Sequence, residues 1–286
     1  MERYYQFAGV TVKVSGDDRE VFRDDGILSD FRVARCAADF SLELRVVDRV
    51  DPPSGTRVFQ NGVLSIFRDD DQELRYVGGT GEIGENAYLR ISGCGEHGVA
   101  QFRRRDISGH ITPKNALNAM EAEHLLAEHG ALLLHASYIC CNGQAILFTA
   151  PSGTGKSTQA ELWRTLRGAA LINGDRAAIR MLGCDAVAAG VPFSGSSGVC
   201  RNETMPLRAI VYLSQAKTTT IRRLGMSEAF RRVWEGCSVN VWNRADVESC
   251  TQSLAETLKA IPVFHLACTP DETAVAALEK ALERLE

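Results

Sequence analysis

The sequence has little lysine: of its 32 basic residues only 6 are lysine, and the other 26 are arginine. It also lacks a surplus of positive charge, because 36 acidic residues give a formal net charge of −4. Binding to nucleic acid without sequence preference needs such a surplus, so we expect no nucleic-acid partner. Because lysine is scarce in this chain, a lysine inside a recognisable motif is less readily explained as an incidental surface residue.

Long apolar segments are also missing. The most apolar stretch, residues 131–141, is too short to cross a bilayer and contains His135, so we expect no membrane association. The first residues show neither the basic nor the apolar segment of a secretory signal. The nine cysteines include no Cys-x-x-Cys pair, and the adjacent Cys140 and Cys141 suit neither a disulfide nor the usual zinc spacing. Reduced, mostly buried thiols and a cytoplasmic location are expected.

The 286 residues are 45% apolar and 24% charged, which is typical of a globular protein with one large or two small domains. Residues 1–110 predict a strand-rich N-terminal domain, suited to docking a substrate or partner. The apolar pattern alternates within residues 5–14, and Asn61-Gly62 between two apolar runs predicts a hairpin with a type I′ turn. Further strands are expected over 73–77, 87–92 and 99–104. No motif in this half indicates chemistry.

Residues 111–286 predict a second domain of α/β class. A helix is expected from Thr112, with Pro113 in its first turn, to Gly130. Strands then alternate with helices, as in an α/β core. The last helix is expected to begin at the capping box Thr269-Pro270-Asp271-Glu272 and to run to about Leu285.

The most informative segment joins a buried strand, residues 145–150, to an amphipathic helix. Between them the chain matches the phosphate-binding pattern G-x-x-x-x-G-K-[ST], except that Ala150 replaces the first glycine. The expected contacts to phosphate come from Ser152, Gly153, Thr154, Gly155, Lys156, Ser157 and Thr158. The glycines allow backbone N–H groups to point at phosphate oxygens, Lys156 adds a point charge, and the Ser157 hydroxyl can bind Mg²⁺. A glycine-rich turn with an incidental lysine is the alternative, and the order strand, loop, Lys-Ser and helix disfavours it.

An acidic residue follows the next buried strand, residues 169–173, in the sequence Gly174-Asp175-Arg176. A carboxylate at the end of a strand, one helix after the phosphate loop, is where a Mg²⁺-associated aspartate is expected. We therefore predict that Asp175 and Ser157 hold the metal. Arg176 is expected to form a surface salt bridge more readily than a phosphate contact.

These residues resemble the HPr kinase/phosphorylase family, whose nucleotide core is similar to phosphoenolpyruvate carboxykinase. The resemblance rests on four segments: Leu134-His135-Ala136, the turn Asn142-Gly143, residues 150–158 and residues 171–175. It covers about residues 130–215, extends weakly to 261–263, and does not reach the N-terminal half. It implies an α/β phosphate-loop core with ATP and Mg²⁺, and it places His135 beside the phosphates, whereas alone this histidine would be taken as a core residue.

The chain departs from the bifunctional family at two places. Gly174-Asp175 stands where that family has two adjacent aspartates, one of them the general base, and the family's Gly-Arg-Asn stretch is absent after Pro262-Val263. Both differences disfavour an enzyme that acts on HPr itself. The sequence is more similar to HPr-kinase-related proteins of bacterial gene clusters, some of which phosphorylate a peptide serine.

The leading hypothesis is an ATP- and Mg²⁺-dependent serine kinase with Lys156, Asp175 and His135 as catalytic residues and a small protein or peptide as acceptor. A second is a nucleotide-binding regulatory or assembly module with little transfer activity, which Gly174 favours. Carboxykinase chemistry needs further basic and metal-binding residues that the chain does not offer. The small-residue loop 190–198, followed by Arg201, is expected either to close over a phosphate or present the acceptor, or to be a plain connector. Assembly into a homo-oligomer is left open.

Overall fold

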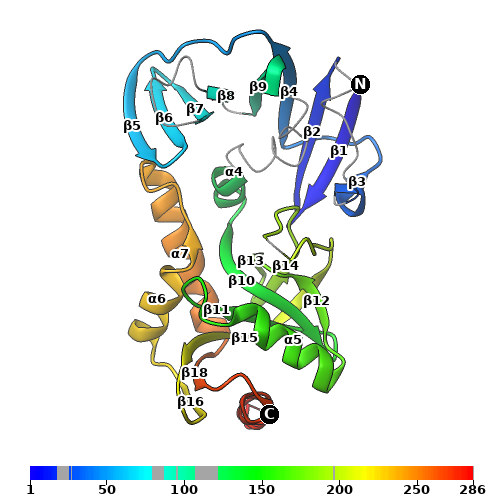
Figure 1. The fold of residues 1–286 in the computed structure, drawn as a ribbon, viewed down its shortest axis with the longest axis vertical. Coiled ribbons are helices and arrows are strands. Elements are labelled where there is room, and N and C mark those ends of the chain that lie inside the picture. Colours follow the sequence, from blue (N-terminus) through cyan, green and yellow to red (C-terminus); the bar gives the residue numbers. More distant parts are fainter. Residues whose placement is uncertain are drawn as a thin grey trace. The chain divides into compact units, whose positions relative to one another are not determined.

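The computed structural model describes residues 1–17, 26, 28–78, 87–94, 96–106, 122–195 and 197–285. It divides into two compact units, Met1–Leu125 and Leu126–Glu286, which we describe separately (Figure 1). Helix α4 (Ala122–Glu128) is followed by Gly130 at a φ of +66°, as predicted, whereas residues 112–121 of that expected helix lie outside the described residues. In the described part of the chain, no helix combines the length and apolar character needed to cross a membrane.

The first unit contains a nine-stranded sheet in the order β3-β1-β2-β4-β9-β8-β7-β6-β5. Its elements are β1 (Glu2–Phe7), β2 (Val10–Gly16), η1 (Leu28–Phe31), β3 (Arg32–Val33), β4 (Phe40–Val47), β5 (Thr56–Asn61), β6 (Leu64–Asp69), β7 (Gln72–Gly78), β8 (Ala87–Cys94), β9 (His97–Arg103) and η2 (Arg104–Asp106). Strand β4 pairs in parallel with β2 and β9, and the other neighbours are antiparallel. The described strands agree with those expected in this half.

Two turns in this sheet differ in detail from the sequence expectation. The alternating segment 5–14 is divided between two strands by a turn at Ala8-Gly9, both of which have positive φ. In the second hairpin Asn61 pairs with Leu64, so the turn consists of Gly62 and Val63 rather than Asn61-Gly62. This register places Phe59 opposite Ile66, and pairing apolar side chains across a sheet stabilises it.

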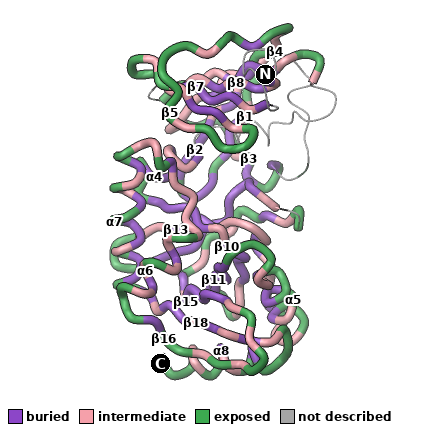
Figure 2. Tube along the Cα trace, turned by 60° about the vertical axis from the view of Figure 1, so that its left-hand side comes forward, coloured by how far each residue is buried: buried purple, intermediate pink, exposed green. Residues whose placement is uncertain are grey.

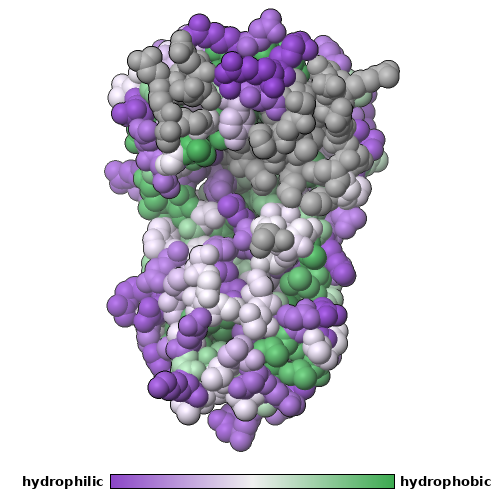
Figure 3. All heavy atoms as spheres, in the orientation of Figure 1, coloured by the Kyte–Doolittle hydropathy of each residue, from purple (hydrophilic) through white to green (hydrophobic). Residues whose placement is uncertain are grey.

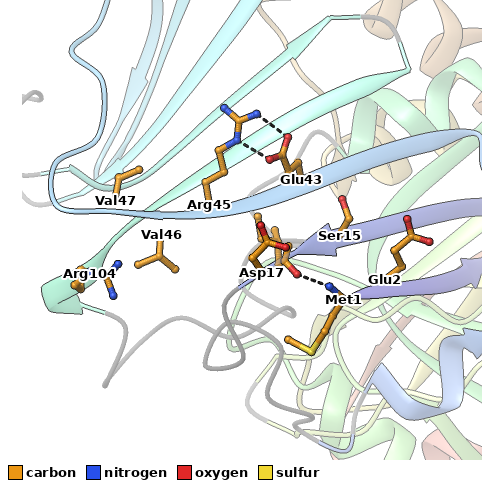
Figure 4. A pocket seen from close by; sticks show the side chains of 11 residues that line it. Met1, Glu2, Ser15, Asp17, Glu43, Arg45, Val46, Val47 and Arg104 are labelled. Carbon is orange, nitrogen blue, oxygen red and sulfur yellow. Dashed lines mark hydrogen bonds and ion pairs between the residues drawn. The ribbon is translucent and has the colours of Figure 1, made fainter.

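A cavity of 750 Å³ lies in the first unit, along β1, β2 and β4 (Figure 4). Several of its charged groups already have partners: Arg45 donates two hydrogen bonds to Glu43, both of 2.7 Å, and the ammonium of Met1 donates to the Gly16 carbonyl at 2.7 Å. Pairs of this kind at a surface neutralise local charge and add little stability. The cavity therefore provides no chemical reason to assign it a ligand, and the predicted docking role of this unit stays a prediction.

The second unit is a mixed α/β structure in which two sheets share strands. One sheet has the order β12-β10-β11-β15-β18-β16, and the other has the order β17-β10-β13-β14-β15. The strands are β10 (Ala131–Cys141), β11 (Gln144–Thr149), β12 (Ala170–Asn173), β13 (Arg176–Leu182), β14 (Asp185–Ala189), β15 (Thr204–Gln215), β16 (Thr220–Arg223), β17 (Cys237–Ser238) and β18 (Val263–Cys268). Strands β11, β15 and β18 are parallel neighbours, so their carboxyl ends meet at one edge.

Helices cover both faces of the sheet that contains β11. Ile146 and Phe148 pack with apolar residues of α5 (Lys156–Arg167) and α8 (Glu272–Glu283), whereas Leu147 packs in the cluster of α6 (Met226–Trp234) and α7 (Arg244–Ala260). This alternation follows from the two-residue repeat of a strand. Figure 2 shows the buried central strands, and Figure 3 shows hydrophilic and hydrophobic residues interspersed on the face in view. The central strand is thus held rigidly from both sides.

The ends of two elements test the local predictions. Asn142 and Gly143 both have positive φ and join β10 to β11, so the predicted turn is confirmed. The predicted start of the last helix is wrong by two residues: Asp271, not Thr269, is the N-cap, and its side chain accepts from the Thr273 N–H. Both residues are good caps, and Pro270 precedes the helix instead of occupying its first turn.

Candidate active site

The glycine-rich loop follows the buried strand β11 and leads directly into α5. Gly153 and Gly155 have φ angles of +77° and +115°, a region that side-chain-bearing residues rarely adopt. Ala150 is not among the described non-glycine residues with positive φ, so alanine is tolerated where the motif usually has glycine. Gly155 is also the N-cap of α5. Because glycine has no side chain, no side-chain cap accepts hydrogen bonds from the first N–H groups of the helix. This is the local geometry that binds anions.

Lys156 is the first residue of α5, and its side chain is buried, with 7% of the residue exposed. Its Nζ donates to the Ala150 carbonyl at 2.9 Å and to the Pro151 carbonyl at 3.4 Å, so the ammonium lies inside the loop. Burial lowers the pKa of Lys156, and the negative charge of Asp175 partly offsets that effect. An ammonium has three donors, so one donor is left for an anion.

Four other residues predicted to contact phosphate carry hydroxyl groups, two in the loop and two in the first turn of α5. Ser152, Ser157 and Thr158 are exposed, and Thr154 is half-buried. The Thr154 N–H donates to the Pro151 carbonyl at 3.3 Å, which closes the turn before Gly155. The loop is therefore ordered by its own backbone while its hydroxyl groups remain accessible.

Asp175 and His135 form a direct pair at the edge of the sheet. His135 Nε2 lies 3.3 Å from Asp175 Oδ1, and both side chains are partly exposed. The hydrogen bond from His135 is the main cause that lowers the pKa of Asp175, with further contributions from the charges of Arg176 and Lys156. His135 and Asp175 are thus in contact, and the charges of Asp175 and Lys156 affect each other's pKa. Arg176 lies 3.5 Å from the same carboxylate, as expected for a salt bridge.

Asn173 positions Asp175, although it is not among the site residues that the sequence predicts. Its side chain is fully buried, and its Oδ1 accepts hydrogen bonds of 2.9 Å from the N–H groups of Asp175 and Arg176. Its Nδ2 donates to the carbonyls of Val191 and Phe193. Asparagine at the end of a strand and directly before Gly-Asp often forms a turn, so this position of Asn173 is the sequence feature that indicates its role.

Replacing Asn173 with alanine should destabilise the protein by about 2–4 kcal/mol, because buried carbonyl and N–H groups lose their partners. The change is measured by urea unfolding. Gln252→Ala, on the exposed surface of α7, is the matched control and should shift stability by less than about 0.5 kcal/mol. A loss for Asn173→Ala as small as that of the control would contradict this role.

The small-residue loop that follows β14 packs on Asp175. A Cβ on Gly195 would lie only 2.7 Å from Asp175 Oδ1, so a side chain at this position would collide with the carboxylate. Two backbone hydrogen bonds hold the residues that directly follow this loop against β12 and its end: the Gly174 N–H donates to the Val199 carbonyl at 3.4 Å, and the Arg201 N–H donates to the Ile172 carbonyl at 2.9 Å. The structure therefore places this loop at the site and does not support a free connector.

A second cavity, of 370 Å³, opens beside the glycine-rich loop at the carboxyl ends of β15 and β18. Its walls are Gly153, Thr154, Gly155, Thr158, Gln159, Leu213, Ser214, Gln215, Ala216, Cys268, Thr269 and Pro270. In α/β proteins, ligands bind outside the carboxyl ends of parallel strands. Sequence reasoning missed this wall because β15 and β18 are distant from the loop along the chain.

Ser214 is fixed in that wall by His265, since Ser214 Oγ and His265 Nε2 are 2.8 Å apart. Burial lowers the pKa of His265, and the charges of Arg222 and Arg232 lower it further. The ring is therefore neutral near pH 7, and the hydrogen bond holds the hydroxyl in a defined position.

The fold and this site define a class: a mixed α/β protein in which a central strand leads through a glycine-rich, lysine-containing loop into a helix. The chain belongs to the family described as SynChlorMet cassette protein ScmC, whose model matches residues 120–283. No curated protein matches the chain. Among solved structures, the HPr(Ser) kinase/phosphatase of Coxiella burnetii matches with a TM-score of 0.30 and 12% identity, over 53% of this chain and 93% of that one.

Proposed function

We propose that this protein is a kinase that transfers the γ-phosphate of ATP to a serine hydroxyl of a small protein or peptide. The observation that carries the proposal is the combination of two features. Lys156 is buried and hydrogen-bonded inside the loop, and the nearby Asp175–His135 pair carries a negative charge that raises the pKa of this lysine. Phosphoryl transfer needs positioning and neutralisation of charge more than covalent chemistry. The residues of this cluster offer both.

The phosphates would be held by the loop and by Lys156. The backbone N–H groups of Gly153 and of residues 155–157 would supply donors, and the N-terminus of α5 would add its partial positive charge. Lys156 would exchange its hydrogen bonds to the Ala150 and Pro151 carbonyls for phosphate oxygens. This exchange supports binding because charge-assisted hydrogen bonds are stronger than bonds to neutral carbonyls.

Mg²⁺ fits the oxygen donors at this site. No group of three or more His, Cys, Asp or Glu side chains within reach of a single metal ion occurs among the described residues. Mg²⁺ bound with a nucleotide takes few protein ligands, because phosphates and water complete its shell. The Ser157 hydroxyl and the Asp175 carboxylate would hold it, and the ion would neutralise phosphate charge.

The proton of the acceptor serine would pass to the Asp175–His135 pair. The pKa of Asp175 is lowered, so the carboxylate is ionised at neutral pH and can accept a hydrogen bond from the attacking hydroxyl. His135 orients that carboxylate through their hydrogen bond, and it would share the proton that the carboxylate receives from the serine. A weak base suffices in a reaction whose transition state is loose.

The nucleoside would occupy the 370 Å³ cavity beside the loop. Gln215 lines this cavity and reaches the loop, since its Nε2 lies 3.5 Å from the Gly153 carbonyl. The hydroxyl of Ser214, held by His265, offers a hydrogen-bonding group to the sugar or base. Inorganic phosphate would bind only at the loop. Contacts at both the loop and the cavity would therefore make the protein select a nucleotide over inorganic phosphate.

A nucleotide-binding module with little transfer activity is the second candidate. It is favoured by Gly174, because the residue beside Asp175 carries no second carboxylate. In that case ATP would bind or turn over slowly, and no acceptor would be labelled.

Incubation of the purified chain with γ-labelled ATP, Mg²⁺ and serine-containing candidate peptides separates the two candidates. A kinase is expected to transfer label to a serine, and omission of Mg²⁺ should abolish that transfer. Binding without transfer to any protein or peptide would support the module, whereas absence of ATP binding, measured by calorimetry, would refute both.

A further inference from the structure

A serine of the chain itself lies against the residue that precedes Asp175. Gly174 has no side chain, and Ser197 fills the space: a Cβ on Gly174 would lie 2.2 Å from Ser197 Oγ and 2.6 Å from Ser197 Cβ. Ser197 is exposed. A serine of a solvent-exposed turn thus packs against the residue that directly precedes the candidate general base.

This position is fixed by the loop on both sides of Ser197. The Phe193 carbonyl accepts from the buried Asn173 side chain, and the Val199 carbonyl accepts from the Gly174 N–H. The Gly198 N–H donates to the Gly195 carbonyl at 3.2 Å, and Gly198 has a φ of +65° that favours glycine. The turn therefore directs Ser197 onto Gly174 by backbone bonds rather than by chance packing.

The hydroxyl of Ser197 is also chemically available. Its Oγ accepts one hydrogen bond, from the Val199 N–H at 3.3 Å. A serine hydroxyl has one donor and two acceptor lone pairs, so its O–H hydrogen and a lone pair remain for other partners. A nucleophile in phosphoryl transfer needs both, since the lone pair attacks and the hydrogen leaves.

We propose that Ser197 is a site of self-phosphorylation, in which each chain modifies its own loop. The inference rests on the proposed kinase function. The Ser197 oxygen forms a bond to the γ-phosphorus of ATP, the bond from that phosphorus to the bridging oxygen breaks, ADP leaves, and the serine proton passes to Asp175. The acceptor is therefore a serine flanked by small residues, presented by a glycine-closed turn.

The test is incubation of the full chain with Mg²⁺ and γ-labelled ATP in the absence of any other acceptor, followed by mapping of the phosphate by mass spectrometry. One phosphate on Ser197 is expected, and Ser197→Ala should lose it. Ser227→Ala, an exposed serine in the first turn of α6 and outside this loop, is the matched control and should retain the label. Thermal unfolding of both variants establishes that they are folded.

Dilution and mixing test whether the reaction is intramolecular. The first-order rate should not change with protein concentration, and Lys156→Ala chains mixed with wild-type chains should stay unlabelled. Label that persists in Ser197→Ala, or label on Ser197 of the Lys156→Ala chains, overturns the inference. Label on a peptide but none on Ser197 overturns it and leaves the kinase function standing, whereas absence of ATP binding overturns both.

Discussion

Lys156→Ala should weaken ATP binding about 10- to 100-fold and reduce phosphate transfer by a further factor of about 10² to 10³. The expected loss is large because the ammonium is buried within the loop and is held there by the Ala150 and Pro151 carbonyls. Alanine removes the only charge of this side chain and leaves both carbonyls without that donor. Calorimetry measures the first effect, and a γ-labelled ATP transfer assay measures the second.

Lys259→Ala is the matched control for that experiment. Lys259 is exposed near the end of α7, on an element that does not line the cavity beside the loop. The same loss of a lysine should leave ATP binding and transfer at wild-type levels. If Lys156→Ala behaved like this control, the proposed role of the loop in phosphate binding would be wrong.

Asp175→Asn should reduce transfer about 10²- to 10⁴-fold while ATP binding changes much less. Asparagine keeps the size of the side chain but removes the negative charge that accepts the serine proton and attracts Mg²⁺. The pKa of Asp175 is held below its usual value, so the wild-type carboxylate is ionised at neutral pH, whereas asparagine carries no charge at any pH. Transfer rates and nucleotide affinity measured on the same protein separate the two effects.

The matched control for this variant is Asp185→Asn, at the exposed start of β14. It removes one negative charge from the same unit without touching the pair with His135. Equal rates for Asp185→Asn and wild type are expected. Transfer by Asp175→Asn at a similar rate would exclude Asp175 as the base.

Local sequence was a good guide where the backbone itself sets the structure. Gly153 and Gly155 occupy the positive φ angles that the motif requires, and Asn142-Gly143 forms the expected turn. Both depend on steric limits of a few consecutive residues, which the sequence states directly. The start of α8 differs from the prediction because Thr269 and Asp271 are both good caps, and local rules do not choose between them.

Contacts between distant segments were harder to predict. The hydrogen bond of Ser214 with His265 joins residues 51 positions apart, and the collision of a Cβ on Gly195 with Asp175 involves two separate loops. Neither pair has a spacing that a local rule would detect. The sequence hypothesis nevertheless named the loop 190–198 and Asp175 separately, and the structure places them together.

The glycine-rich loop, its lysine, and the strand and helix on either side can be predicted from local sequence, because they depend on backbone conformation and on the repeat of apolar residues. Lys156 stands out among the six lysines in the same way, and the structure shows that side chain buried inside the loop. The contact of His135 with Asp175, the turn held by Asn173 and the packing of Ser197 on Gly174 become visible only in the folded chain. The reason is that sheet pairing and loop packing join residues far apart in the chain, and their free energies depend on the whole fold.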